Sequence, residues 1–143
     1  MKHGRYTALA AAIMVLFVAA LTGCGSGSSP VLIDQNGRLV GNWGSKVRPT
    51  QMQLSSAGGQ FNDLGTCFGG PLAGPVIPDA AGHFSVAGTY KNQTGNTSVH
   101  YTGTVTGSTM KVDVVADNNG QAILSLTLVF GQQPPSQTGG CPG

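Results

Sequence analysis

The sequence has no glutamate and little charge of either sign. Its 143 residues include five aspartates and seven lysines or arginines, so that charged side chains make up only 8% of the chain. Two of the basic residues, Lys2 and Arg5, lie in the first seven positions, and the remaining chain is formally neutral. Nucleic-acid binding depends largely on lysine and arginine side chains that neutralise phosphates. The composition therefore predicts no nucleic-acid partner.

The motifs that usually carry catalysis or hold a cofactor are also missing. The glycines form no Gly-x-x-x-x-Gly-Lys phosphate loop and no Gly-x-Ser-x-Gly elbow around a nucleophilic serine. No Cys-x-x-Cys pair or cysteine–histidine cluster indicates a metal site. General acid–base catalysis needs titratable groups within reach of one substrate. We therefore predict a protein that is not an enzyme and that carries no cofactor and no metal.

Two histidines allow chemical alternatives to this prediction. His83 lies two positions from Ser85 and close to Asp79, which together are the residue types of a hydrolase triad. Residues two apart in a strand have Cα atoms about 7 Å apart, too far for an easy hydrogen bond. A metal site shared by His83 and His100 on paired strands is the second alternative. Both histidines alternate with apolar residues, so we favour a polar outer face.

The longest hydrophobic run is too short for a permanent membrane span. It extends over 14 residues from Ala8 to Leu21, after Lys2 and Arg5 and before small residues. Spanning a bilayer core takes about 20 helical residues, whereas this three-part pattern is typical of a signal peptide. We expect the signal peptide to cover residues 1–23. The 120 residues that remain of 143 are enough for one domain.

The tetrapeptide Leu21-Thr22-Gly23-Cys24, directly after the hydrophobic run, resembles the lipobox of bacterial lipoproteins. The resemblance implies that the thiol of Cys24 carries fatty acyl chains such as palmitate and becomes the first residue of the mature protein. Gly25 is not the aspartate that marks retention in the inner membrane, so in a source with two membranes we expect the outer one. The predicted partner is the membrane of the cell envelope, through this lipid anchor. The alternative is an ordinary secretory signal with a coincidental cysteine.

Cys67 and Cys141 remain as a pair once Cys24 is assigned to the lipid. In an oxidising compartment we expect them to form a disulfide. The bond would join residues 74 positions apart, and a loop of that size stabilises a small domain by about 4 kcal/mol in the chain-entropy account. A metal site and a nucleophilic thiol are the alternatives.

Apolar and polar residues alternate with a period of two through most of the mature chain, and no helix start or stop is visible. Gly107-Ser108 separates two alternating runs and is typical of a two-residue hairpin. Residues 91–97 are polar throughout and are expected to form an exposed loop. Strands are predicted at residues 39–43, 50–54, 61–67, 71–77 (an edge strand, because of its prolines), 83–90, 98–106, 109–116 and 122–130.

These seven to eight strands in hairpin succession predict an all-β fold, a small antiparallel up-and-down meander. Closing the meander into a barrel would remove its exposed edges. Gly88 and Gly103 fall at inward positions, where a barrel needs bends. A two-sheet β-sandwich is the alternative. We expect the lipidated cysteine and a linker over residues 24–36, the β domain over 37–131, and a C-terminal tail over 132–143 that Cys141 pins.

About residues 41–130 resemble a set of small, uncharacterised exported bacterial β proteins. The resemblance implies a fold and no active site. It is carried by Cys67, the glycine- and proline-rich stretch after it, Gly82-His83-Phe84, residues 86–90, residues 101–105 and Met110.

The expected function is a non-enzymatic binding or structural module of the cell envelope, with an envelope protein as a further partner. One alternative is a carrier that holds a small apolar ligand in a barrel cavity lined by the faces of Phe84 and Leu124. Another is an inhibitor of a foreign enzyme. Aromatic side chains more often fill a small barrel than line a cavity in it, so we expect a filled interior.

Overall fold

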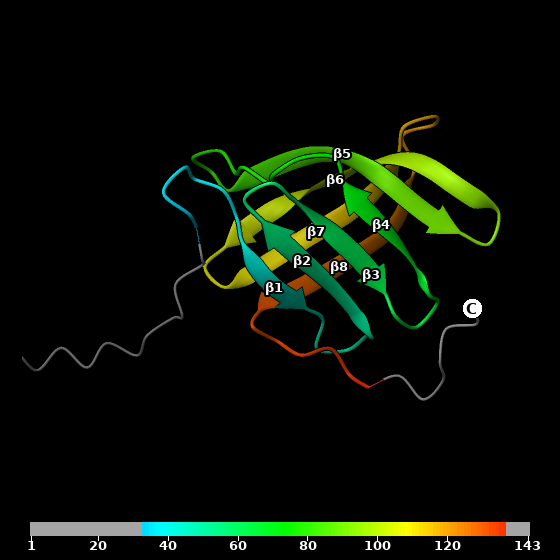
Figure 1. The fold of residues 1–143 in the computed structure, drawn as a ribbon, viewed down its shortest axis with the longest axis horizontal. Coiled ribbons are helices and arrows are strands. Elements are labelled where there is room, and N and C mark those ends of the chain that lie inside the picture. Colours follow the sequence, from blue (N-terminus) through cyan, green and yellow to red (C-terminus); the bar gives the residue numbers. More distant parts are fainter. Residues whose placement is uncertain (1–32, 137–143) are drawn as a thin grey trace, which may run out of the picture.

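The computed structural model describes residues 33–136, and within that range the chain forms strands and no helix (Figure 1). Each strand pairs antiparallel with the next, and β8 pairs with β1, so the sheet closes into an up-and-down barrel. The predicted barrel is confirmed, and the sandwich alternative is wrong. The strands are β1 (Gly41–Gly44), β2 (Thr50–Ser55), β3 (Gly58–Asp63), β4 (Phe68–Leu72), β5 (His83–Asn92), β6 (Gly95–Thr106), β7 (Thr109–Ala116) and β8 (Ala122–Phe130).

Alternation along the strands places one face of each in the barrel interior, as the sequence pattern predicts. Met110, Val112 and Val114 of β7 are buried, while Lys111 and Asp113 between them face solvent. The interior is built from apolar side chains of every strand, together with Leu39 and Val76. The fully buried large residues include Leu39, Trp43, Met52, Phe61, Val76, Val99, Tyr101, Met110, Val112, Val114 and Leu128.

The predicted strand over residues 71–77 is wrong, because β4 lies earlier, at Phe68–Leu72. It is also not an edge strand, since it lies between β3 and β5. Its pairing with β5 is recorded only at Gly69 and Leu72, with Gly70 and Pro71 between them outside the ladder. Proline has no N–H to donate. Gly70 and Pro71 keep their partners on β3, so the gap is confined to the β4–β5 ladder.

Three other predicted boundaries need correction. The first strand is Gly41–Gly44 rather than 39–43, since Leu39 forms only an isolated bridge with Ile33. The strand predicted over residues 61–67 is Gly58–Asp63, so it begins three residues earlier and ends four residues earlier than predicted. Residues 91–97 are not all loop, because β5 and β6 continue to Asn92 and from Gly95.

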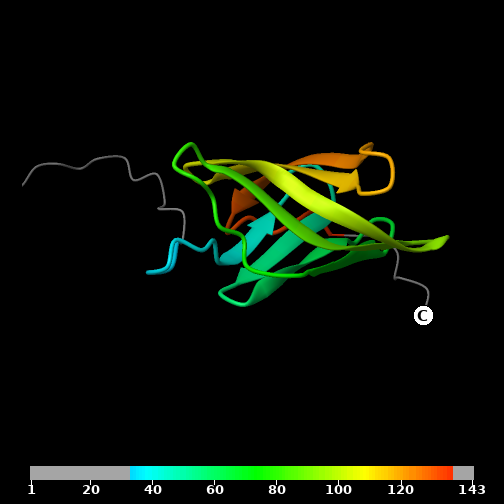
Figure 2. The same cartoon turned by 90° about the horizontal axis from the view of Figure 1, so that it is seen from above.

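The loops gather at two ends of the barrel (Figures 1 and 2). One end, which we call the N-terminal end, carries residues 33–40, the β4–β5 connection and the tight turns β2–β3 and β6–β7. The opposite end, the far end, carries the connections β1–β2, β3–β4, β5–β6 and β7–β8. Among the described residues there is no helix long and apolar enough to cross a membrane.

Candidate functional site

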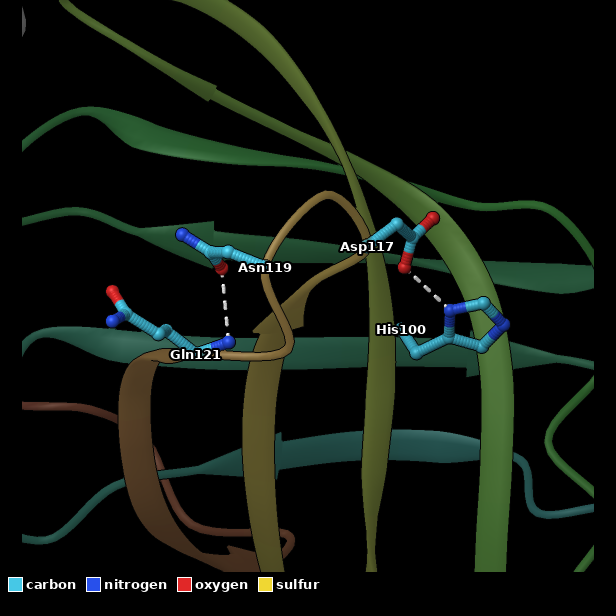
Figure 3. Close-up of polar contacts among 4 residues, drawn as sticks. All are labelled: His100, Asp117, Asn119 and Gln121. Atoms are coloured by element: carbon cyan, nitrogen blue, oxygen red, sulfur yellow. Dashed lines mark hydrogen bonds and ion pairs between the residues drawn. The ribbon is translucent and has the colours of Figure 1, made fainter.

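Within residues 33–136, the outer wall holds one close pair of titratable side chains, His100 and Asp117 (Figure 3). His100 projects from β6, and its Nδ1 lies 2.6 Å from Oδ1 of Asp117, the residue that follows β7. The backbone N–H of Asp117 donates to the carbonyl of Ser98, at 3.1 Å. In the adjoining loop, Asn119 Oδ1 accepts the N–H of Gln121 at 2.9 Å. The two contacts of Asp117 fasten the start of the β7–β8 connection onto β6, and the Asn119 contact shapes the connection itself.

A histidine–carboxylate pair acts as a catalytic base only when the other ring nitrogen reaches a nucleophile or a substrate. Within residues 33–136 the His100 ring forms a hydrogen bond with Asp117 alone. Both side chains are open to water, with exposed fractions of 49% and 36%. Exposed pairs of this kind usually contribute about 0–1 kcal/mol to stability. The arrangement supports a fastening of the loop better than a reactive centre.

The structure assigns His83, Ser85 and Asp79 to the outer surface without joining them into a triad. His83 Nδ1 lies 2.9 Å from Thr104 Oγ1, its partner across the β5–β6 ladder. Asp79 Oδ1 accepts the backbone N–H groups of Ala81 and His83 instead of the imidazole. The carboxylate thus caps the turn before β5, and the predicted polar outer face is confirmed.

The two histidines do not share a site. In the β5–β6 ladder His83 is opposite Thr104, whereas His100 is opposite Ala87. In the part of the chain that the structure describes, no group of three histidine, cysteine, aspartate or glutamate side chains could hold a metal ion.

The far end contains a buried polar cluster that sequence reasoning missed. Asp63 is only 3% exposed, and Thr50, opposite it in the β2–β3 ladder, is fully buried. Thr50 Oγ1 donates to Asp63 Oδ1 at 3.4 Å, and the N–H of Gly65 donates to the same oxygen at 3.2 Å. A buried carboxylate needs such partners to offset its desolvation. Asp63 follows the inward-facing Phe61 by two positions, and this spacing is a signal that could have found it.

Tyr90 lies between this cluster and the aromatic interior. Its ring centroid is 6.2 Å from that of Phe61 and 6.3 Å from that of Phe68. Burial raises the pKa of Tyr90, the negative charge of Asp63 adds to the rise, and Arg48 partly opposes it. The far end of the barrel is therefore closed by aromatic rings and by a small set of interacting polar groups.

Aromatic rings also contact one another in the interior. Trp43 is fully buried, and its ring meets that of Phe130 edge-on with centroids 5.3 Å apart. Phe61 and Tyr101 approach to 5.6 Å across the barrel. Phe84 also borders a depression on the outer surface, which opens beside Ile77 and Pro78 and does not lead into the barrel interior. The packing of these rings favours a filled interior, which stays a prediction.

Tyr101 is expected to make the fold sensitive to alkali. Its hydroxyl donates to the carbonyl of Thr89 at 2.9 Å, and burial raises its pKa well above the ordinary value of 10.0. Above pH 10 the unfolded chain loses this proton while the folded chain keeps it, so stability falls as pH rises. The loss is about 1.4 kcal/mol per pH unit until the folded pKa is reached. Urea unfolding at pH 8 to 11 measures it.

The matched variant is Tyr101→Phe. It is expected to start about 1 kcal/mol less stable, because the Thr89 carbonyl loses its donor, but to lose much less stability above pH 10. Equal alkaline slopes for variant and wild type would show that Tyr101 ionises as freely in the folded chain as in the unfolded one.

Cys67 lies in the β3–β4 turn with a positive φ of 59° and is disulfide-bonded. Its predicted partner Cys141 lies outside the described residues, as does the predicted lipidation site Cys24, so the pairing and the anchor stay predictions. The described part of the tail runs alongside β1. Gly44 is the last residue of β1 before the far end. A Cβ added at Gly44 would lie 3.3 Å from Cδ of Pro134.

The fold and its side chains define a small, closed up-and-down barrel with an apolar core and a largely polar wall. The chain matches no protein-family model, no curated protein and no solved structure.

Proposed function

We propose that the protein is a lipoprotein of the bacterial cell envelope, held on the membrane by acyl chains on Cys24. In this proposal the barrel acts as a non-enzymatic binding or structural module, on the outer membrane in a source that has two. No cofactor or metal takes part.

The proposal of a non-enzymatic protein is supported by one observation: most of the aspartate and histidine side chains form hydrogen bonds within the fold. Four of the five aspartates, Asp34, Asp63, Asp79 and Asp117, accept hydrogen bonds that fix turns or join strands. His83 and His100 likewise bond to groups on a neighbouring strand or loop. Catalytic groups are instead left poised toward a substrate.

The structure weakens one alternative function, a carrier of a small ligand, and favours another, an inhibitor of a foreign enzyme. The carrier of a small apolar ligand is weakened by the packed rings of the interior. The inhibitor of a foreign enzyme is favoured by the β1–β2 connection, where Val47 is 85% exposed between Lys46 and Arg48. Ser45, itself buried, accepts the N–H groups of Val47 and Arg48 and so braces this tip. A braced, exposed tip suits contact with a protein partner under either the binding or the inhibitor function.

The anchor is tested on the wild-type protein in its own envelope. Cells grown with alkynyl palmitate are expected to yield a labelled mature chain that begins at Cys24, identified by mass spectrometry of its N-terminal peptide. The protein should resist extraction by salt and dissolve in detergent, because several acyl chains bind a bilayer durably. An unacylated mature chain, released into the periplasm or medium, would contradict the proposal.

A further inference from the structure

We infer that the N-terminal end of the barrel is a membrane-contact surface that seats on the bilayer holding the Cys24 acyl chains. The inference rests on the proposed lipid anchor. It adds which face of the domain meets the lipid and by what chemistry.

The tether between the anchor and the barrel joins the barrel at its N-terminal end (Figures 1 and 2). Eight residues separate Cys24 from Ile33, where the described chain begins. The nine Cα–Cα steps between them span at most about 32 Å. The 12 residues of β6 extend about 40 Å along the strand, or about 30 Å along the barrel axis at a tilt of about 40°. Only a fully extended tether would let the far end meet the membrane, so contact at the N-terminal end is favoured.

That same end exposes two large aliphatic side chains. Ile33 is 52% exposed and Ile77 is 55% exposed. The segments that carry them lie in one small ladder, since Ile33 bridges Leu39 and the N–H of Leu39 donates to the carbonyl of Val76 at 2.9 Å. Ile77 and Pro78 also border the surface depression that reaches Phe84. We call Ile33, Ile77 and Pro78 the apolar rim.

The charges around the apolar rim indicate contact with the apolar part of the lipid rather than with anionic headgroups. Asp34 and Asp79 are acidic and cap the backbone of their own turns. Arg38 is the neighbouring cation, and its Nη1 donates to the carbonyl of Ser56. This balance offers no excess of positive charge for acidic lipids. The apolar rim should therefore contact a bilayer of zwitterionic lipid, and this contact should persist at high salt.

Two half-exposed isoleucines are too few to bind a membrane from solution. A tether raises the effective concentration of the second contact to the millimolar range, so a weak surface can still set orientation. We expect a preference of about tenfold for the seated orientation in the lipidated protein, and no vesicle binding by the unlipidated domain.

Tryptophan quenching by brominated acyl chains tests the surface, because the only native tryptophan, Trp43, is fully buried. The lipidated mature chain is placed in phosphatidylcholine vesicles as Ile77→Trp, with Val47→Trp at the far end and Ile123→Trp on β8 as matched controls. We expect about half of the added fluorescence to be quenched at position 77 and less than about a tenth at position 47. Adding Ile33→Asp to Ile77→Trp should lower the quenching at least about twofold.

Flotation of each sample separates the two possible failures. Protein that does not float with the vesicles contradicts the lipid anchor itself. Protein that floats but shows equal quenching at positions 77, 47 and 123, or the strongest quenching at 47, overturns the contact surface and leaves the anchor standing. Quenching at position 77 that disappears in 0.5 M salt would also overturn it, because the apolar rim should not depend on charge.

Discussion

The variant Cys24→Ser is expected to lose its fatty acyl label and to leave the membrane fraction. A single myristoyl-sized chain binds membranes with a constant of only about 10⁴ M⁻¹, whereas two or more chains hold a protein durably. Removing the acceptor thiol removes all of them at once. The palmitate label per molecule should fall at least about 50-fold, measured by in-gel detection after metabolic labelling, with the membrane-bound fraction followed by flotation.

Cys67→Ser is the matched control, since it also removes one thiol from the same chain. It should keep the full acyl label and the membrane location. Its cost is expected in stability instead, because Cys67 is disulfide-bonded in the folded protein. Loss of a disulfide between residues 67 and 141 would lower the free energy of unfolding by about 4 kcal/mol. Label that persists in Cys24→Ser, or disappears in Cys67→Ser, would refute the assignment of the anchor.

The C-terminal half of the barrel was predictable because its hairpins are local. The alternation of β7 and β8 predicts both strands with the boundaries that the structure has, 109–116 and 122–130. Gly107 supplies the positive φ of 56° that the two-residue turn between β6 and β7 requires. Neighbouring strands, turn chemistry and hydrophobic period agree in this region, so sequence alone suffices.

The β3–β4 region was not predictable in the same way. Glycines within its strands resemble turn signals, yet at Gly70 any Cβ would lie 1.9 Å from the carbonyl oxygen of Thr89 on β5. That contact exists only after the barrel has formed, and no local pattern records it. The reason for glycine at this position is therefore tertiary.

The polar contacts also fall into two groups: those that local sequence indicates and those that exist only in the folded barrel. Asp first and Gly last are typical of a type I turn, so the residues from Asp79 to Gly82 indicate their own turn, in which Gly82 donates its N–H to the Asp79 carbonyl. The pair His100 and Asp117 depends on the fold, since the β6–β7 ladder has to bring residues 17 positions apart to 2.6 Å. Asp63 was missed because aspartate is rarely buried without a partner, and Thr50 becomes its partner only through the β2–β3 register.

Replacing Gly103 by alanine is expected to destabilise the barrel by about 3 kcal/mol, at the upper end of the cost of overpacking. Gly103 sits in the middle of β6, opposite Phe84 on β5 and Val112 on β7. A Cβ there would lie 2.0 Å from the carbonyl oxygen of Lys111 and 2.8 Å from Cζ of Phe84. The carbonyl is part of the β6–β7 ladder, so relief requires the ladder to move. The melting temperature should fall by about 15 °C.

Gly74→Ala is the matched control, because no atom lies within 4 Å of a Cβ at that position and its φ is not in the left-handed region. It should be neutral or up to about 1 kcal/mol stabilising, through the lower entropy of the unfolded chain. Adding Phe84→Leu to Gly103→Ala removes the ring contact but leaves the Lys111 carbonyl in place. It should therefore restore less than about half of the lost stability. Melting temperatures for Gly103→Ala and Gly74→Ala that agree within about 2 °C would mean that β6 does not need its close approach to β7 at this point.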